Sequence, residues 1–124
     1  MPMKRILMTL LVVVIAMSAN AQKGFVCTGN NVNLRKGPGN NYKVVVSDYT
    51  GERFILVKGA VLKDLGQKKN GFCKVSTFIH QQGEYYGWVS AKYLKPVRLC
   101  SNCEGLGYVN NVFDTCTKCN GRGY

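Results

Sequence analysis

The C-terminal part of the chain carries two copies of one cysteine motif. The pattern C-x-x-C-x-G-x-G begins at Cys100 and again at Cys116, so that with Cys103 and Cys119 the repeat supplies four thiols. Two residues between paired cysteines let one turn direct both sulfurs at the same ion, and a second turn completes a tetrahedron around Zn²⁺. The glycines after each pair let the backbone bend sharply around the sulfurs. The spacing therefore predicts one structural zinc ion, because four sulfur ligands leave no open position for water.

Two other interpretations of the four tail cysteines stay open. In an oxidising compartment they could form structural disulfides, for which four cysteines allow three pairings. A C-x-x-C pair could also be redox-active, as in thioredoxin-like proteins, although the βαβ context of those proteins is missing here. A tail of this length has little core of its own, so a crosslink of some kind must hold it together.

The repeat resembles the cysteine-rich zinc region of J-domain co-chaperones, which carries such motifs in pairs. The resemblance covers residues 100–124 and implies a zinc-binding hairpin. Only two copies of the motif occur, and the chain shows no J-domain signature. The resemblance therefore does not imply co-chaperone activity.

Two further cysteines, Cys27 and Cys73, lie on segments that we expect to be strands. In an oxidising compartment a disulfide could join them and link the N-terminal strand to a central one. The alternative is two separate buried thiols.

The chain lacks the signs of a catalytic site. His80 is its only histidine, and no serine, cysteine or carboxylate signature accompanies it. A cysteine peptidase of the cell-wall type would need a nucleophile and a base on a larger fold. No alternation of strand and helix patterns suggests a (β/α)₈ barrel or a doubly wound sheet in these 124 residues. We therefore expect a non-enzymatic protein with an exposed His80.

The first 21 residues have the pattern of a secretory signal peptide. Lys4 and Arg5 precede an apolar run over residues 6–17, which is shorter than the roughly 18 residues of a spanning helix. Ala19 and Ala21 are the small residues expected before a cut after Ala21. We expect a secreted or periplasmic protein with no stable membrane anchor after cleavage. An uncleaved membrane anchor or a buried helix are the alternatives.

The charge is strongly basic, with 17 Lys and Arg against 6 Asp and Glu and a formal net charge of +11. Loss of residues 1–21 would remove Lys4 and Arg5 and leave +9. Outside the cytoplasm the available anions are cell-wall carboxylates, lipid headgroups and polysaccharides more often than nucleic acid. The lysines concentrated in residues 58–69 have no interleaved aromatic residues for base stacking. We therefore expect no nucleic-acid partner and a basic surface that keeps the protein soluble.

Between residues 25 and 97, short β-branched or aromatic runs alternate with Gly, Asn and Pro. Strands are expected at residues 44–46, 54–57, 72–78 and 85–89. No segment has a helical period over three turns. The pattern predicts an all-β barrel or sandwich of five or six strands.

This middle segment resembles bacterial SH3-like (SH3b) domains. The family's opening signature is matched by the residues NLRKGP at 33–38 with YKV at 42–44, and its closing signature by GWV at 87–89 with YL at 93–94. The resemblance implies an SH3-like barrel that binds a cell-wall peptide or another extracellular ligand. Two features depart from the family: Phe72 stands where Trp is usual, and the stretch from Lys58 to Asn70 is longer than the usual hairpin, which suggests an inserted loop.

The apolar and aromatic residues of the barrel divide into expected core residues and candidate ligand contacts. A small barrel closes by burying large apolar side chains. The expected core residues are Val32, Leu34, Val44, Phe72, Val75, Trp88 and Leu94. The candidate ligand contacts are Tyr42, Tyr49, Tyr85 and Tyr86, since a tyrosine can line a groove or cover the barrel rim.

The sequence thus predicts an all-β protein made of an SH3-like barrel and a short zinc-ribbon-like β-hairpin. The expected division is a signal peptide over 1–21, an SH3b domain over 22–97 and a cysteine-rich zinc-binding tail over 98–124. The expected function is an exported, non-catalytic binding or adaptor module that recognises a cell-wall peptide, a glycan or an envelope protein. The alternative is an envelope protein that docks to another polypeptide through the tail, without wall binding.

Overall fold

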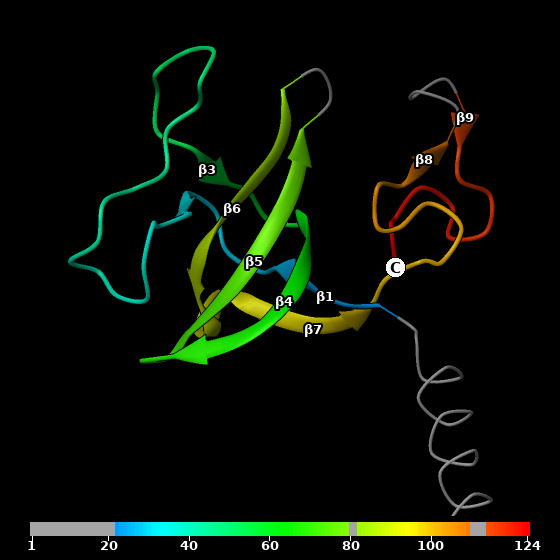
Figure 1. Cartoon of the computed structure of the whole chain (residues 1–124). Coiled ribbons are helices and arrows are strands. Elements are labelled where there is room, and N and C mark those ends of the chain that lie inside the picture. The colour runs from blue at the N-terminus through cyan, green and yellow to red at the C-terminus, as the bar shows by residue number, and fades with distance from the viewer. Residues whose placement is uncertain (1–21, 80–81, 110–113) are drawn as a thin grey trace, which may run out of the picture.

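The computed structural model describes residues 22–79, 82–109 and 114–124, and these form an almost entirely β protein (Figure 1). The expected signal peptide and His80 lie outside the described residues. No helix within the described residues is long and apolar enough to cross a membrane. The elements are β1 (Lys23–Cys27), β2 (Val32–Asn33), β3 (Ile55–Leu56), β4 (Val61–Lys69), β5 (Phe72–Ile79), β6 (Gly83–Ser90), the 3₁₀ helix η1 (Ala91–Tyr93), β7 (Leu94–Arg98), β8 (Tyr108–Val109) and β9 (Asp114–Thr115).

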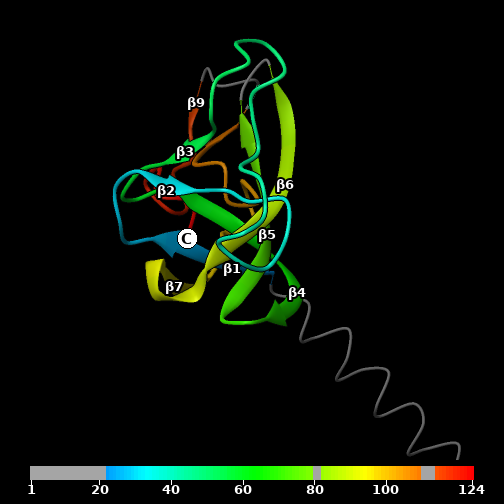
Figure 2. The same cartoon turned by 90° about the vertical axis from the view of Figure 1, so that its left-hand side faces the viewer.

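The barrel is built on one antiparallel sheet with the strand order β6-β5-β4-β1-β7. β4, β5 and β6 are long and strongly curved (Figure 1), and β2 and β3 pair with each other in a second, two-stranded sheet (Figure 2). Just after β2, the Arg35 N–H donates to the Trp88 carbonyl at 2.9 Å, and the Trp88 N–H donates to the Arg35 carbonyl at 2.7 Å. This pair joins the chain after β2 to the β6 edge of the large sheet. The all-β prediction is confirmed.

The core follows the two-residue alternation of the strands. On β5 and β6 the residues Cys73, Val75, Tyr85 and Val89 point inward. Their neighbours on β6 are exposed or half-buried, whereas on β5 Phe72 and Ser76, on the opposite face, are buried as well. The remaining buried members of the core are Phe25, Cys27, Val32, Leu34, Leu56 and Leu62.

Four of the seven expected core residues are buried, namely Val32, Leu34, Phe72 and Val75. The other three, Val44, Trp88 and Leu94, are only half-buried. Trp88 follows the inward-facing Gly87 on β6, so its side chain lies on the outer face of the strand.

Gly87 occupies its inward position because a larger residue would not fit there. A Cβ at Gly87 would lie 2.7 Å from the Leu34 side chain and 2.7 Å from the Arg35 carbonyl. The glycine of the GWV segment therefore permits the close approach that joins the chain after β2 to β6.

The prediction of an inserted loop between Lys58 and Asn70 is wrong, because β4 occupies most of this stretch. β4 pairs with β1 at one end and with β5 along its length, with a register shift between Asp64 and Lys68. Gly66 lies in this bulge at φ +82°, and its N–H donates to the Asp64 Oδ1 at 2.8 Å. The charged half of β4 is exposed, so it lacks the apolar alternation by which a strand is predicted.

The other expected strands are confirmed in part. β5 and β6 contain the segments predicted at 72–78 and 85–89. The segment predicted at 54–57 shortens to β3. The segment at 44–46 forms only isolated bridges, from Val44 to Arg35 and from Val46 to Arg53.

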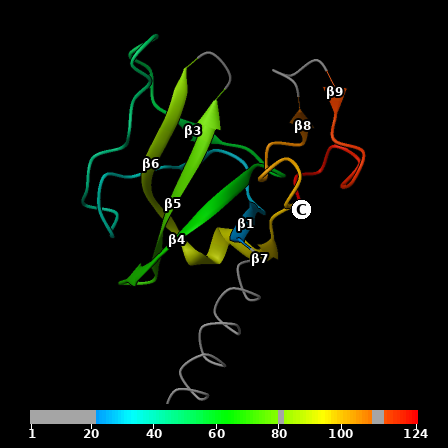
Figure 3. The same ribbon diagram turned by 45° about the vertical axis from the view of Figure 1, so that its right-hand side comes forward.

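The tail packs against the barrel through Leu99, directly after β7. Leu99 is 4% exposed, and its N–H donates to the Gln22 carbonyl at 2.9 Å. Its side chain lies so close to Gly24 of β1 that a Cβ there would collide with it, and the position of a Cβ on Gly105 of the tail lies 3.3 Å from it. Figure 3 shows β8 and β9 beside the barrel, on the side of β1 and β7. Leu99 thus connects the first strand of the barrel to the cysteine-rich segment.

Candidate metal centre

Each half of the cysteine repeat folds as a tight turn around its own sulfurs. In the first half, the Leu106 N–H donates to the Cys103 carbonyl at 3.0 Å, and the Gly107 N–H donates to the Cys103 Sγ at 3.2 Å. Glu104 adopts φ +54°, which directs the chain back over the sulfur. Cys100 lies one turn earlier, and its carbonyl accepts from the Glu104 N–H at 2.8 Å.

The second half repeats this arrangement. The Arg122 N–H donates to the Cys119 carbonyl at 3.2 Å, and the Gly123 N–H donates to the Cys119 Sγ at 3.2 Å. Asn120 adopts φ +54° at the place of Glu104 in the first half. The sequence repeat is therefore also a structural repeat.

The two halves exchange backbone hydrogen bonds. The Cys100 N–H donates to the Gly123 carbonyl at 2.9 Å, and the Cys116 N–H donates to the Gly107 carbonyl at 3.0 Å. A Cβ at Gly123 would lie 2.5 Å from the Gly105 carbonyl oxygen, and one at Gly107 would collide with the carbonyl of Gly121. The motif therefore needs glycines for two reasons. They adopt positive φ, and they let the two halves approach closely.

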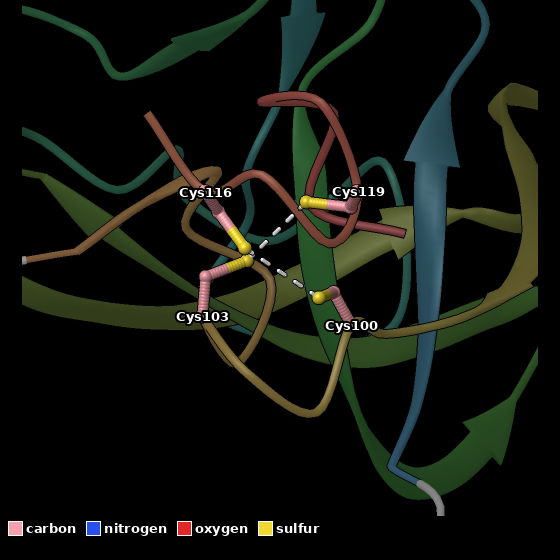
Figure 4. A group of neighbouring side chains, drawn as sticks. All are labelled: Cys100, Cys103, Cys116 and Cys119. Carbon is pink, nitrogen blue, oxygen red and sulfur yellow. Dashed lines mark hydrogen bonds between the residues drawn. The ribbon is translucent and has the colours of Figure 1, made fainter. Parts of the chain in front are cut away.

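The four sulfurs converge on one point (Figure 4). Their Sγ atoms all lie within 4.8 Å of one another, with 3.8 Å between Cys100 and Cys116 and 3.6 Å between Cys103 and Cys119. A tetrahedral ion with metal–sulfur bonds of about 2.3 Å has sulfur–sulfur edges of about 3.8 Å. A disulfide bond is only about 2.05 Å long. The geometry fits one four-sulfur metal site and differs from that of two disulfides.

All four cysteines are buried, and the tail forms a small core of its own around them with Val109 packed against it. Thiolates are the metal-binding form of cysteine, and burial without a partner disfavours them. Four converging buried sulfurs are therefore suited to holding a cation that binds thiolates, such as Zn²⁺.

The surroundings of the sulfurs shift their pKa values in opposite directions. The Asn102 Nδ2 donates to the Cys116 Sγ at 3.4 Å, and this bond is the main cause that lowers the pKa of Cys116 to about 6. A hydrogen bond from the Cys103 backbone N–H lowers the pKa of Cys100. Burial raises the pKa of Cys103 to about 11. Hydrogen-bond donors therefore favour the thiolates of Cys100 and Cys116, whereas at Cys103 burial outweighs the N–H donor from Gly107.

Sequence reasoning missed two contacts that support the site. Asn102 lies between the paired cysteines, where the motif accepts any residue. The Lys118 Nζ donates to the Ser101 Oγ at 2.8 Å and joins the two turns on the outside. The sequence indicates such contacts only by placing a hydroxyl and an amide side chain between the two cysteines of a C-x-x-C pair.

Cys27 and Cys73 are both buried free thiols in the barrel core. The Cys27 Sγ contacts the Gly29 carbonyl at 3.3 Å. Burial raises the pKa of Cys73, which favours its neutral thiol. β4 lies between β1 and β5 in the sheet order, so the two cysteines are on strands that do not pair. The disulfide between them stays a prediction.

The four candidate tyrosines occupy different environments. Tyr42, Tyr49 and Tyr86 are exposed, at 43%, 68% and 56%. Tyr85 is buried, with its hydroxyl 3.2 Å from the Gln82 Oε1 and its ring 4.9 Å from that of Phe54. Tyr85 is therefore a core residue, and Tyr86 points to the opposite face of β6.

Tyr42 also has a structural contact, because its ring lies so close to Gly37 that a Cβ there would collide with it. None of the four tyrosines lines the cavity between barrel and tail, the cavity beside Cys100 and Cys119, or the cavity beside Asn33 and Tyr93. Ligand binding by Tyr42, Tyr49 and Tyr86 stays a prediction.

No protein-family model, curated protein or solved structure matches this chain. The resemblances to SH3b domains and to the co-chaperone zinc region therefore rest on the motifs alone.

Proposed function

We propose that the four tail cysteines hold one structural Zn²⁺. The observation that supports this is the spacing of the sulfurs, 3.6 and 3.8 Å, in a buried and closed cluster. Cys100, Cys103, Cys116 and Cys119 would be the four ligands, and the ion would supply a crosslink between the two halves of the repeat. Four protein ligands leave no position for a substrate or an activated water.

We further propose that the chain is an exported, non-catalytic binding module of the cell envelope. In this proposal the cysteine cluster stabilises the tail. The ligand binds at the surface of the barrel and at the junction of barrel and tail. The SH3b-like signatures, the signal-peptide pattern of the first 21 residues and the net charge of +11 support this role. The ligand would be a cell-wall peptide, a glycan or another envelope protein.

Metal analysis of protein purified without added zinc tests the first proposal. We expect one zinc per chain and four thiols that are protected from alkylation until a chelator is added. A metal-free protein with four oxidised tail cysteines would overturn the zinc site.

A pulldown with purified peptidoglycan, at low and at moderate salt, tests wall binding. We expect the zinc-loaded protein to be retained in both conditions, because a specific site depends less on salt than a diffuse basic surface does. No retention in either condition would exclude wall binding and leave another envelope polypeptide as the partner.

A further inference from the structure

A groove of about 540 Å³ lies where the tail packs against the barrel. Its barrel side comes from β4, β5 and β6 and includes Ser76 and Phe78. Its other side comes from the cysteine turns and includes Leu106. This volume is within the usual range of small-ligand sites in proteins.

The groove contains a buried hydroxyl without a hydrogen-bond partner. Ser76 is 1% exposed, and its Oγ has no partner in the protein. It lies on β5 between Lys63 of β4 and Tyr86 of β6 in the sheet register. Burying a hydroxyl without a partner is unfavourable, so such a group in the wall of a groove is explained by a ligand that bonds to it.

The barrel's other buried serine shows the contrast. The Ser47 Oγ lies 3.1 Å from the Gln82 Oε1 and accepts from the backbone N–H groups of Tyr49 and Thr50 at 3.2 and 3.4 Å. Ser47 therefore serves the fold, whereas Ser76 has no such internal use.

The groove also exposes apolar surface on both of its sides. Phe78 is 46% exposed on the barrel side, and Leu106 is 39% exposed on the tail side. A ligand in the groove would therefore cover apolar groups in addition to reaching Ser76.

Charges of both signs line the groove, which limits the class of ligand. Lys63 and Arg122 are basic, and Glu84 and Glu104 are acidic. Within the part of the chain that the structure describes, Lys63, Glu104 and Arg122 form no ion pair. A neutral glycan would offer hydroxyls but no charge opposite to these groups, and a polyanion would meet two carboxylates. A ligand that carries both an ammonium and a carboxylate complements them.

We propose that this groove binds a short peptide segment that contains one acidic and one basic side chain. The Ser76 hydroxyl bonds to the peptide backbone, and Phe78 and Leu106 contact its apolar atoms. The inference specifies the ligand class within the proposed binding function and rests on it. It also assigns recognition to the junction of barrel and tail, away from Tyr42, Tyr49 and Tyr86.

Titrations followed by amide NMR of the zinc-loaded chain test the groove. The probes are acetyl-Glu-Ala-Ala-Lys-amide and acetyl-Lys-Ala-Ala-Glu-amide, with the uncharged acetyl-Gln-Ala-Ala-Gln-amide as control. We expect saturable shifts at Ser76, Phe78, Gly105 and Leu106 with at least one charged peptide and weaker binding of the control. No saturable shifts with either charged peptide, or equal binding of the uncharged one, would overturn the proposal.

Two matched serine variants separate binding from stability. Ser76→Ala should weaken peptide binding by about 3- to 10-fold, as expected for the loss of one hydrogen bond. It should leave the thermal midpoint unchanged or raise it, because it removes no internal bond. Ser47→Ala should lower the midpoint and leave peptide affinity unchanged. Equal peptide affinity of Ser76→Ala and the unmodified chain would overturn the role of Ser76.

The groove and the wall-binding function can fail separately. Retention on peptidoglycan without peptide binding in the groove would overturn the groove and leave the proposed function. Peptide binding in the groove without retention on peptidoglycan would overturn wall binding and leave the groove.

Discussion

At the residue scale, a single side-chain amide adjusts the chemistry of the cysteine cluster. Asn102 donates to the sulfur of Cys116 from the opposite half of the repeat, and thereby stabilises a thiolate. Groups that hydrogen-bond to metal ligands commonly change metal affinity by about 10- to 100-fold. Its neighbour Ser101 offers a control position for measuring the effect of Asn102, because the Ser101 hydroxyl contacts Lys118 and no sulfur.

Replacing Asn102 with alanine should weaken zinc binding by about 10-fold or more. The hydrogen bond lowers the pKa of Cys116, so its loss raises that pKa and lets protons compete with zinc at higher pH. The loss of affinity should therefore be larger at pH 6 than at pH 8. Competition with a chromophoric chelator measures it, with Ser101→Ala as the control. Equal affinities of the two variants at both pH values would contradict the role of Asn102.

The four cysteines of the cluster could be predicted from the sequence, because a metal site imposes a fixed spacing on its ligands. Asn102 and Ser76 could not be. The first occupies a position that the motif leaves free, and the second is distinguished only by the absence of a partner inside the folded protein. Long-range contacts decide the role of such residues, and a sequence motif does not record them.

At the scale of elements, the segment between β7 and the first cysteine turn fixes the tail on the barrel. Leu99 fills the space left open by Gly24 of β1 and contacts the tail near Gly105. The backbone bond from Leu99 to Gln22 extends the pairing of β1 and β7 by one more step. The tail thus begins as a continuation of the sheet.

Leu99→Ala should destabilise the protein by about 2 to 4 kcal/mol, since it leaves a cavity at a buried contact. Urea unfolding at a fixed free zinc concentration measures the change. Leu65→Ala on the exposed half of β4 is the matched control, because Leu65 is 37% exposed and should lose far less stability. Equal losses in the two variants would show that Leu99 does not anchor the tail.

Among the elements, the strands β5 and β6 could be predicted from their aromatic and β-branched residues. The strand β4 could not be predicted in this way. The exposed half of β4, residues 65–69, contains two lysines and has Gly66 in a bulge, so its composition is that of a loop. Its hydrogen bonds to β5 nevertheless make it a strand. Pairing across the sheet outweighed local propensity in this segment.

At the scale of the whole molecule, the barrel and the tail have separate buried clusters. The barrel cluster is formed by apolar side chains with Cys27 and Cys73, and the tail cluster is formed by the four remaining cysteines with Val109. The two clusters share no residue, and Leu99, which belongs to neither, lies between Gly24 of the barrel and Gly105 of the tail. The barrel's stability should therefore depend little on metal.

A strong chelator should unfold the tail and leave the barrel folded. Hydrogen exchange followed by mass spectrometry should then show rapid exchange in residues 100–109 and 114–124. Protection in β5 and β6 should be retained, because their bonds lie within the barrel sheet. Loss of protection in β5 on chelation would show that barrel and tail unfold as one cooperative unit.

The paired glycine carbonyls of the tail have a consequence for how the site assembles. The first cysteine of each half donates its backbone N–H to a glycine carbonyl of the other half, Gly123 for Cys100 and Gly107 for Cys116. An isolated half has neither the second pair of sulfurs nor the carbonyl that orders its first cysteine. We therefore expect cooperative assembly, in which the loss of one cysteine opens both turns together instead of leaving a half-formed site.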